Sequence, residues 1–183
     1  MLGVEAVAIL PSTARIACRE TGPTNELDVL VLATGFHPHA WGIDHVSGVD
    51  GLSLKQAWQQ GTRTYRSVAM PGFPNLFMLA GPNCPLGNIS VIDVSETVAE
   101  YVLGCLDRLT KGDIQTLMPN EEATRRFNES LVEAMDNTIW TTGCDSWYLD
   151  ENGIPGLWPW TAGRFHSEMK RPEFEEYDLV AAD

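Results

Sequence analysis

Apolar positions repeat with helical spacing in two parts of the chain. Between Ser90 and Leu109 they recur at three- and four-residue steps, which is the spacing of one face of an α-helix. The positions are Val91, Val94, Val98, Tyr101, Val102, Cys105 and Leu109. Ser90 is a suitable N-cap, and Gly112 ends the pattern. A second amphipathic helix is predicted from its N-cap Asn120 to Met135, with two glutamates in the first turn.

Two further patterns predict strands. Val4–Leu10 and Ala14–Cys18 are short β-rich runs around a polar turn, as in a hairpin or in successive edge strands. Asp28–Ala33 and Asn75–Ala80 are largely apolar runs that a glycine follows closely. Because apolar and polar residues do not alternate in them, they indicate strands buried on both faces, as in a parallel sheet covered by helices. The fold class predicted for the chain is therefore α/β.

The remaining segments are predicted to be connections. Residues 19–27 are turn material, and residues 36–74 are an excursion outside the core with one helical turn at Ser53–Gln59. Four of the six tryptophans lie between positions 140 and 160 among Gly, Pro and Asp, which indicates an irregular, Trp-rich segment. The last stretch, Glu168–Asp183, is acidic and is expected to be loosely ordered.

Charge and composition narrow the function classes. The 183 residues include 12 Lys and Arg against 25 Asp and Glu, a net charge of −13 that disfavours nucleic-acid binding. No stretch approaches the roughly 20 apolar residues of a membrane span, and the start lacks the basic residues of a signal peptide. The four cysteines are far apart and fit neither a zinc site nor a disulfide framework. We expect a cytoplasmic protein that binds no metal and no membrane.

One segment has the arrangement of a ligand site. Gly81 follows an apolar run, and a Gly-containing loop, Pro82–Asn88, leads into the helix that begins near Ser90. In α/β folds, free N–H groups at such a helix start bind anionic or electron-rich groups, although a tight turn with no ligand is an equally good interpretation. Cys84 has no identifiable histidine partner, and the loop histidines at 37, 39 and 45 fit no metal spacing. The tryptophans are interpreted as packing residues more readily than as a stacking platform.

Several blocks in a fixed order resemble one family. They are residues 27–36 (LDVLVLATGF), 51–58 (GLSLKQAW), 64–67 (TYRS), 71–83 (PGFPNLFMLAGPN) and 138–153 (TIWTTGCDSWYLDENG). Together they resemble the class B flavin-dependent monooxygenases, and within these the Baeyer-Villiger monooxygenases. The resemblance covers about Asp28 to Trp160. It implies the C-terminal part of a Rossmann-like flavoprotein with two dinucleotide-binding domains, one for FAD and one for NAD(P), followed by the Trp-rich tail.

The resemblance also implies a domain organisation. Residues 1–27 would be the end of an NADP-domain-like segment and a linker, and residues 28–136 the C-terminal part of the FAD-binding domain. Residues 137–183 would hold the control-loop-like aromatic segment and the acidic tail. The Gly-rich turns, the family fingerprint and the catalytic arginine of the family belong upstream of Asp28. No catalytic residue is therefore assigned to this chain, which is expected to be inactive in isolation.

The activity implied is the insertion of one oxygen atom from O₂ into a ketone, with FAD and NADP as cofactors. The alternatives are an N- or S-oxygenating flavin monooxygenase, and an inactive fragment or subunit that completes a separately encoded flavin domain, its partner being the missing N-terminal half. The cofactor-binding residues by resemblance are Thr34, Gly35, Asn83, Asn88, Ser90, Val91 and Trp147. Those shaping the substrate pocket are Pro85, Leu86 and Gly87. Asp93 departs from the family, which usually has an apolar residue there.

Overall fold

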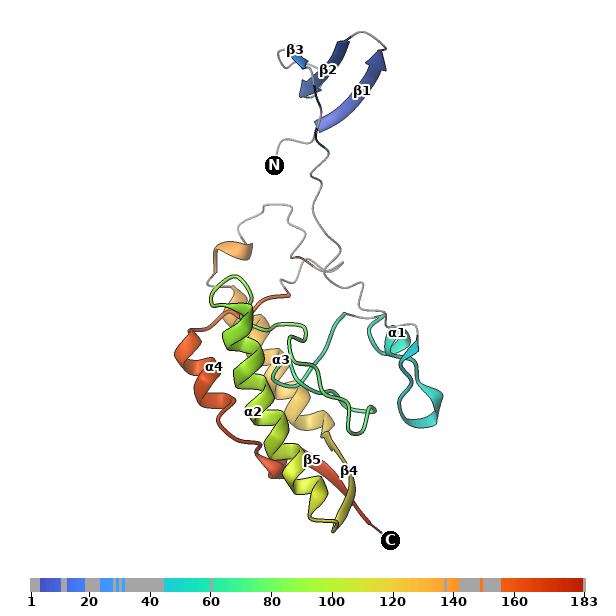
Figure 1. The fold of residues 1–183 in the computed structure, drawn as a ribbon, viewed down its shortest axis with the longest axis vertical. Helices are drawn as coiled ribbons and strands as arrows, with labels where there is room; N and C mark the ends of the chain where they lie inside the picture. The colour runs from blue at the N-terminus through green and yellow to red at the C-terminus, as the bar shows by residue number, and fades with distance from the viewer. Residues whose placement is uncertain are drawn as a thin grey trace. The chain divides into compact units, whose positions relative to one another are not determined.

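A computed structural model gives the fold in two compact units, residues 1–37 and 38–183 (Figure 1). The residues that the structure describes are 4–10, 13–18, 24–27, 29, 31, 45–59, 61–136, 138–141, 149 and 156–182. For residues 4–27 only the backbone is described. No helix in these ranges is long and apolar enough to cross a membrane.

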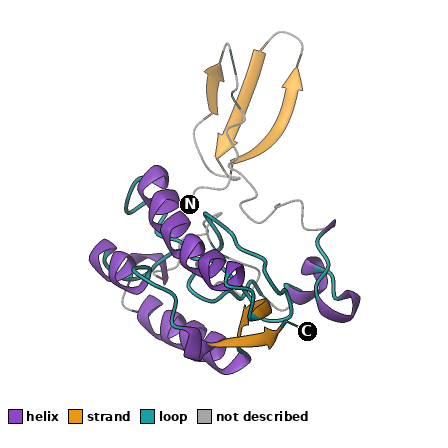
Figure 2. Ribbon diagram, turned by 60° about the horizontal axis from the view of Figure 1, so that its bottom comes forward, coloured by secondary structure: helices purple, strands orange, loops and turns teal. Residues whose placement is uncertain are grey.

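The first unit contains a three-stranded antiparallel sheet of order β1-β2-β3 (Figure 2). Strands β1 (Val4–Leu10) and β2 (Thr13–Cys18) form the predicted hairpin, with Leu10 opposite Thr13. Strand β3 (Thr24–Leu27) pairs with the other edge of β2. The prediction that residues 19–27 are only turn material is thus wrong for β3, because an open strand edge pairs with polar sequence through backbone bonds alone.

Helix α2 (Val91–Thr110) confirms the first predicted helix. The Ser90 side chain accepts a hydrogen bond from the Ile92 N–H, and Gly112 follows the helix with a φ of 80°. A left-handed residue at this position is a common way to end a helix. The residues of α2 that are buried lie at the predicted spacing. They are Val94, Val98, Tyr101 and Cys105.

Helix α3 (Glu121–Met135) confirms the second predicted helix, and the Asn120 side chain accepts from the Ala123 N–H as its N-cap. Helix α3 lies beside α2 (Figure 1), and the buried side chains of both belong to one core cluster. Helix α4 (Ala162–Glu168), capped by Thr161, adds Phe165 to the same core.

The acidic C-terminal stretch is ordered, contrary to prediction. After the 3₁₀ turn η4 (Phe174–Glu176), strand β5 (Tyr177–Ala181) pairs antiparallel with β4 (Ile114–Pro119). Tyr177 lies opposite Pro119 and is buried in the core. Only one face of such a two-stranded sheet needs apolar residues, so acidic side chains on its other face are compatible with order.

Two tryptophans belong to the core rather than to a loose tail. The Trp158 side chain is 1% exposed, and its ring centroid lies 4.8 Å from that of Trp160 and 6.2 Å from that of Phe127 on α3. The indole N–H of Trp158 donates to the Thr161 carbonyl oxygen over 3.2 Å. Among the tryptophans described here, packing is therefore the role that the geometry supports, as the sequence favoured.

The excursion predicted for residues 36–74 is partly wrong. Helix α1 (Leu54–Ala57) forms at the predicted turn, with a capping box between Ser53 and Gln56. Residues 64–70, however, are all buried, and Tyr65 and Val68 lie in the main core. A smaller cluster joins α1 to this segment. It consists of Leu54, Met70 and Phe73.

The two buried parallel strands predicted from the apolar runs do not form in the described residues. Of Asp28–Ala33 only Val29 and Val31 are described; they are 75% and 77% exposed and belong to no strand. Asn75–Ala80 follows turns, and its backbone bonds go to single residues such as Val68, which accepts from Met78 over 2.7 Å. A central strand requires paired strands on both sides, and none lies beside these runs in the described residues.

Candidate functional site

The loop from Gly81 to Ile89 is held against the core at its start. A Cβ atom on Gly81 would lie 2.1 Å from the Ser67 carbonyl oxygen, so no side chain fits there. The Thr64 hydroxyl donates to the Pro82 carbonyl oxygen over 3.3 Å. Asn83 has a φ of 64°, and its N–H donates to the Gly156 carbonyl oxygen over 3.1 Å. These contacts place the loop between residues 64–67 and the Trp-rich segment.

The middle of the loop is a compact turn around Pro85. The carbonyl oxygen of Pro85 accepts from the N–H groups of Asn88 (3.1 Å) and Ile89 (3.2 Å). Gly87 has a φ of 97°, and a Cβ atom there would meet nothing within 4 Å, so the loop presents open space at this position. The Asn88 side-chain amide donates to the Trp158 carbonyl oxygen over 3.2 Å, which ties the exposed tip of the loop to the core.

The loop leads directly into the first turn of α2. The Ser90 hydroxyl accepts from the Ile92 N–H over 3.2 Å, and the Val94 N–H donates to the Ser90 carbonyl oxygen. The Val91 and Ile92 side chains are 52% and 66% exposed, so this end of α2 lies at the surface. The start of a helix carries partial positive charge and N–H groups without helical partners. The segment therefore fits an anionic or electron-rich ligand edge.

Asp93, the departure from the family pattern, is directed to another helix. Its carboxylate lies 3.3 Å from the Nε2 atom of His166 on α4, and His166 Nδ1 lies 3.2 Å from the Thr97 hydroxyl. The Asp93 carboxylate thus lies between α2 and α4. An acidic residue in a first turn also stabilises its own helix.

Seven of the residues that the sequence assigned to the site lie in the described part of the chain. They belong to one continuous segment that runs from the buried Asn83 to the exposed start of α2. They are Asn83, Pro85, Leu86, Gly87, Asn88, Ser90 and Val91. The other three, Thr34, Gly35 and Trp147, lie outside the described residues.

The thiol of Cys84 is unsuited to nucleophilic chemistry. The residue is 3% exposed, and burial raises the pKa of Cys84 to about 11. The thiolate is the reactive form, so a thiol that stays protonated at neutral pH is a weak nucleophile. No group of three or more potential metal-ligating side chains occurs among the described residues.

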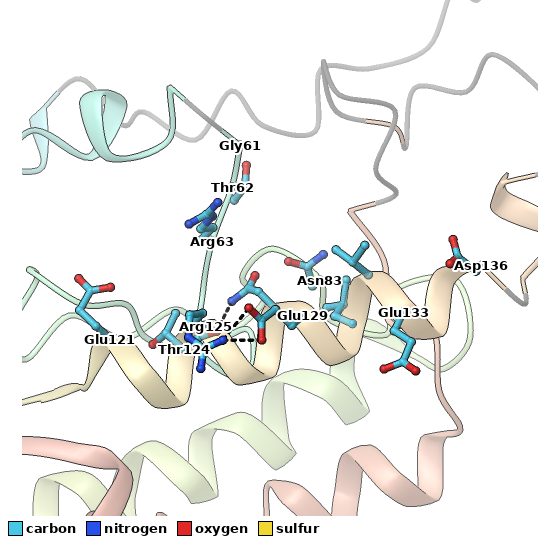
Figure 3. Close-up of a pocket in the computed structure, with 13 residues that line it drawn as sticks. Gly61, Thr62, Arg63, Asn83, Glu121, Thr124, Arg125, Glu129, Glu133 and Asp136 are labelled. Carbon is cyan, nitrogen blue, oxygen red and sulfur yellow. Dashed lines mark hydrogen bonds and ion pairs between the residues drawn. The ribbon is translucent and has the colours of Figure 1, made fainter.

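A hollow of about 630 Å³ adjoins the loop and was missed from the sequence (Figure 3). It is lined by residues 61–63, by Asn83 and by side chains of α3 and its end from Glu121 to Asp136. Asn83 is 6% exposed and lies on the wall of the hollow nearest the loop. Residues 61–63 and α3 are far apart in sequence and share no motif, so no sequence signal indicates this hollow.

The charges of the hollow are mixed. On α3, Arg125 pairs with Glu129 over 2.7 Å and with Glu122 over 2.7 Å (Figure 3 shows the pair with Glu129). The Arg63 side chain extends from the opposite wall. Since two carboxylates neutralise Arg125, the hollow has no concentrated positive charge of the kind that binds phosphate groups.

Known proteins are similar to most of this chain. No protein-family model matches it. A Mycobacterium tuberculosis protein named only as a monooxygenase is 42% identical over 161 residues, which are 87% of this chain and 32% of that protein. A Baeyer-Villiger monooxygenase of Streptomyces coelicolor is 37% identical over 163 residues, 87% of this chain and 31% of that protein.

Solved structures give the same result. A closed crystal structure of cyclohexanone monooxygenase matches with a TM-score of 0.71 and 26% identity, over 89% of this chain and 32% of that one. Cyclohexanone monooxygenase from Rhodococcus sp. Phi1, bound to NADP⁺, matches with a TM-score of 0.70 and 25% identity, over 88% of this chain and 32% of that one.

The chain thus spans about a third of the length of the relatives that it matches. The resemblance predicted from the ordered sequence blocks is confirmed, and the α/β class is supported by a fold of mixed helices and strands similar to cyclohexanone monooxygenase. Over about one third of their length, a Baeyer-Villiger monooxygenase and cyclohexanone monooxygenase are similar to most of this chain.

Proposed function

We propose that this chain is the C-terminal portion of an FAD- and NADPH-dependent monooxygenase that inserts one oxygen atom from O₂ next to a ketone carbonyl. The observation that carries the proposal is the ordered segment from Asn83 to Val91, in a chain similar to named Baeyer-Villiger monooxygenases. When bound, FAD reduced by NADPH reacts with O₂ and supplies the oxygen atom. The chain contributes one wall of the site.

The start of α2 fits the flavin ring. Its N–H groups and helix dipole favour negative charge, which the reduced ring carries at its pyrimidine edge. The exposed Val91 and Ile92 give this end an apolar surface of the kind on which a flat ring rests. Asp93 is compatible with this role because His166 holds its carboxylate toward α4.

The turn around Pro85 fits one wall of the substrate pocket. Pro85 is fully buried and Leu86 partly buried, while Gly87 is exposed and opens space for a small organic molecule. For Thr34, Gly35 and Trp147, the proposal rests on the resemblance alone. The same holds for the division into residues 1–27, 28–136 and 137–183, and for a cytoplasmic location, which NADPH-dependent chemistry favours.

An N- or S-oxygenating enzyme is the alternative within the same chemistry. The ketone reaction is preferred because relatives in two bacteria, Streptomyces coelicolor and Pseudomonas aeruginosa, are named Baeyer-Villiger monooxygenases. The sequence contains no G-x-G-x-x-G motif, so the site for the FAD pyrophosphate is absent from these 183 residues. We therefore expect the chain by itself to retain little or no FAD.

The test uses the chain and a longer protein that includes it. The chain alone is purified with added FAD, and flavin absorbance is measured against protein; a stoichiometric yellow product would contradict the incomplete site. The longer protein is expected to bind FAD, to oxidise NADPH when a cyclic ketone is present and to form the corresponding lactone, identified by mass spectrometry. Oxygenation of amines or sulfides with no lactone would establish the alternative.

A matched pair of variants tests the loop itself. Gly87→Ala and Gly112→Ala both place a side chain at a positive φ, 97° and 80°, and neither Cβ meets a neighbour within 4 Å. Their backbone strain is therefore comparable, about 1 kcal/mol. In the longer protein that includes this chain, only Gly87→Ala is expected to raise the KM for the ketone, and equal effects of both variants would exclude a role for the loop in substrate binding.

A further inference from the structure

Asp93 brings a negative charge into the first turn of α2, where the candidate cofactor site begins. It is the third residue of the helix, and its side chain is 47% exposed. Because the Cα–Cβ bonds of an α-helix tilt toward its N-terminus, an unrestrained carboxylate at this position lies over the first turn. There it would compete with an anionic ligand for the free N–H groups and for the positive end of the helix dipole.

The carboxylate is instead directed to a histidine on another helix. The Ser90 hydroxyl already accepts from the Ile92 N–H over 3.2 Å, so α2 has its N-cap without Asp93. The Nε2 atom of His166 on α4 lies 3.3 Å from the Asp93 carboxylate. The Nδ1 atom of the same ring lies 3.2 Å from the hydroxyl of Thr97, one turn further along α2. One imidazole ring thus spans the first two turns of α2.

The position of the His166 ring is defined by the anchoring of α4. The neighbouring residue Phe165 is fully buried, and its ring centroid lies 5.3 Å from that of Trp158. The Thr161 side chain caps α4 by accepting from the Arg164 N–H. Since both ring nitrogens of His166 also face a partner on α2, the orientation of the ring is defined as well.

We propose that His166 is a positioning residue, which draws the Asp93 carboxylate toward α4 and thereby keeps the start of α2 available to the negatively charged edge of a reduced flavin. The inference rests on the proposed function. A carboxylate left over the first turn would disfavour the reduced ring, because like charges repel. The oxidised ring carries no such charge. The contribution of His166 is therefore specific to the reduced state of the cofactor.

The experiment measures the midpoint potential of FAD in the longer protein that includes this chain, by spectroscopic titration against a reference dye. His166→Ala releases the carboxylate, and His166→Phe does the same while keeping a ring that supports the fold. Asp93→Asn/His166→Ala removes the charge as well. Arg164→Gln is the matched control, because Arg164 is also on α4, is 43% exposed against 42% for His166, and pairs with Glu168 on its own helix over 2.6 Å. Thermal unfolding of each variant checks that the fold is intact.

We expect His166→Ala and His166→Phe to weaken binding of reduced relative to oxidised flavin about three- to tenfold, which makes the two-electron potential about 15–30 mV more negative. The double variant and Arg164→Gln are expected to keep the wild-type potential. An unchanged potential in both His166 variants, or the same shift in the double variant, would overturn the inference. So would an equal loss of affinity for both flavin states, which is what a merely structural role of His166 predicts. The two proposals fail separately. A longer protein that binds no FAD contradicts the proposed function, whereas an FAD-bound protein whose potential is indifferent to His166 contradicts only the positioning role.

Discussion

The phenol oxygens of Tyr101 and Tyr177 lie 2.8 Å apart in the core and join helix α2 to strand β5. Both side chains are buried. The Tyr177 ring also packs edge-on against Tyr65, with ring centroids 5.7 Å apart, and the Tyr65 hydroxyl donates to the Glu176 carboxylate. A strand in the acidic C-terminal stretch is thus attached to the most regular helix by side chains as well as by its pairing with β4.

Tyr177→Phe is expected to destabilise the protein. It leaves the buried Tyr101 hydroxyl without its partner, which costs about 1–3 kcal/mol. Chemical denaturation followed by circular dichroism measures the change. The double variant Tyr101→Phe/Tyr177→Phe is expected to lose less than the sum of the single variants, since it leaves no unpaired hydroxyl. Strict additivity would show that the two hydroxyls do not interact.

Stability is expected to fall as the pH rises above about 9. Burial raises the pKa of Cys84 to about 11 and that of Cys105 to about 12, and it also raises the pKa of Tyr65, Tyr101 and Tyr177. Above the ordinary pKa values of these groups the unfolded chain releases protons that the folded chain retains, so alkali favours unfolding. Spectrophotometric titration of the tyrosine side chains measures the pH at which these protons are released.

Three of the four tyrosines in the sequence are among these groups, so most of the tyrosinate signal is expected to appear only together with unfolding. A titration in denaturant provides the reference in which all four ionise at their ordinary pKa. Reversible ionisation of all four in the folded protein would contradict the burial of Tyr65, Tyr101 and Tyr177.

Gly81→Ala and Gly163→Ala are expected to have opposite effects. At Gly81 the new methyl group would lie 2.1 Å from the Ser67 carbonyl oxygen, so the loop and residues 64–67 must separate. At Gly163, the second residue of α4, it meets nothing within 4 Å, and alanine has a higher helix propensity than glycine, by up to about 1 kcal/mol. Melting temperatures of the two variants test this, and a stable Gly81→Ala protein would contradict the close approach.

Arg66→Met is expected to destabilise the protein far more than Arg125→Met. The Arg66 side chain is 10% exposed and donates to the Glu173 carboxylate over 2.8 Å and to the Glu168 carbonyl oxygen over 2.7 Å. Because the Glu173 carboxylate is 51% exposed, removing Arg66 leaves no buried unpaired charge, and the expected cost is that of lost hydrogen bonds from a charged donor, about 1.5–3 kcal/mol. Arg125 is 54% exposed, where ion pairs contribute little. Urea midpoints compare the two variants, and equal midpoints would show that the Arg66 network is dispensable.

The helices could be predicted from the sequence because the information for each is local. The helical period is visible in the spacing of the buried residues Val94, Val98, Tyr101 and Cys105. The N-caps are Ser90 for α2 and Asn120 for α3, and each lies directly before the helix that it caps. The pairing of β4 with β5 is different. It joins Ile114–Pro119 to residues that follow two further helices, and no local pattern indicates such a partner.

The apolar run Asn75–Ala80 led to the wrong element for a related reason. An uninterrupted apolar run such as Asn75–Ala80 indicates burial. The prediction of a strand assumed in addition that neighbouring strands pair with it, and the described part of the chain contains none beside it. The assignment of a ligand site to Asn83–Val91 stays a prediction, which the sequence allowed because these residues form one continuous segment. The hollow between residues 61–63 and α3 depends on tertiary contacts alone.

The pairing of β5 with β4 has a consequence for synthesis of the chain. Residues 120–176, which include α3 and α4, lie between two segments that backbone bonds join, with Pro119 opposite Tyr177. Helix α2 can form as soon as it leaves the ribosome, because its hydrogen bonds are local. The core around it, however, lacks the Tyr177 ring until β5 has emerged. A nascent chain at that stage leaves the buried Tyr101 hydroxyl without its partner, so closure of this core waits for residues 177–181.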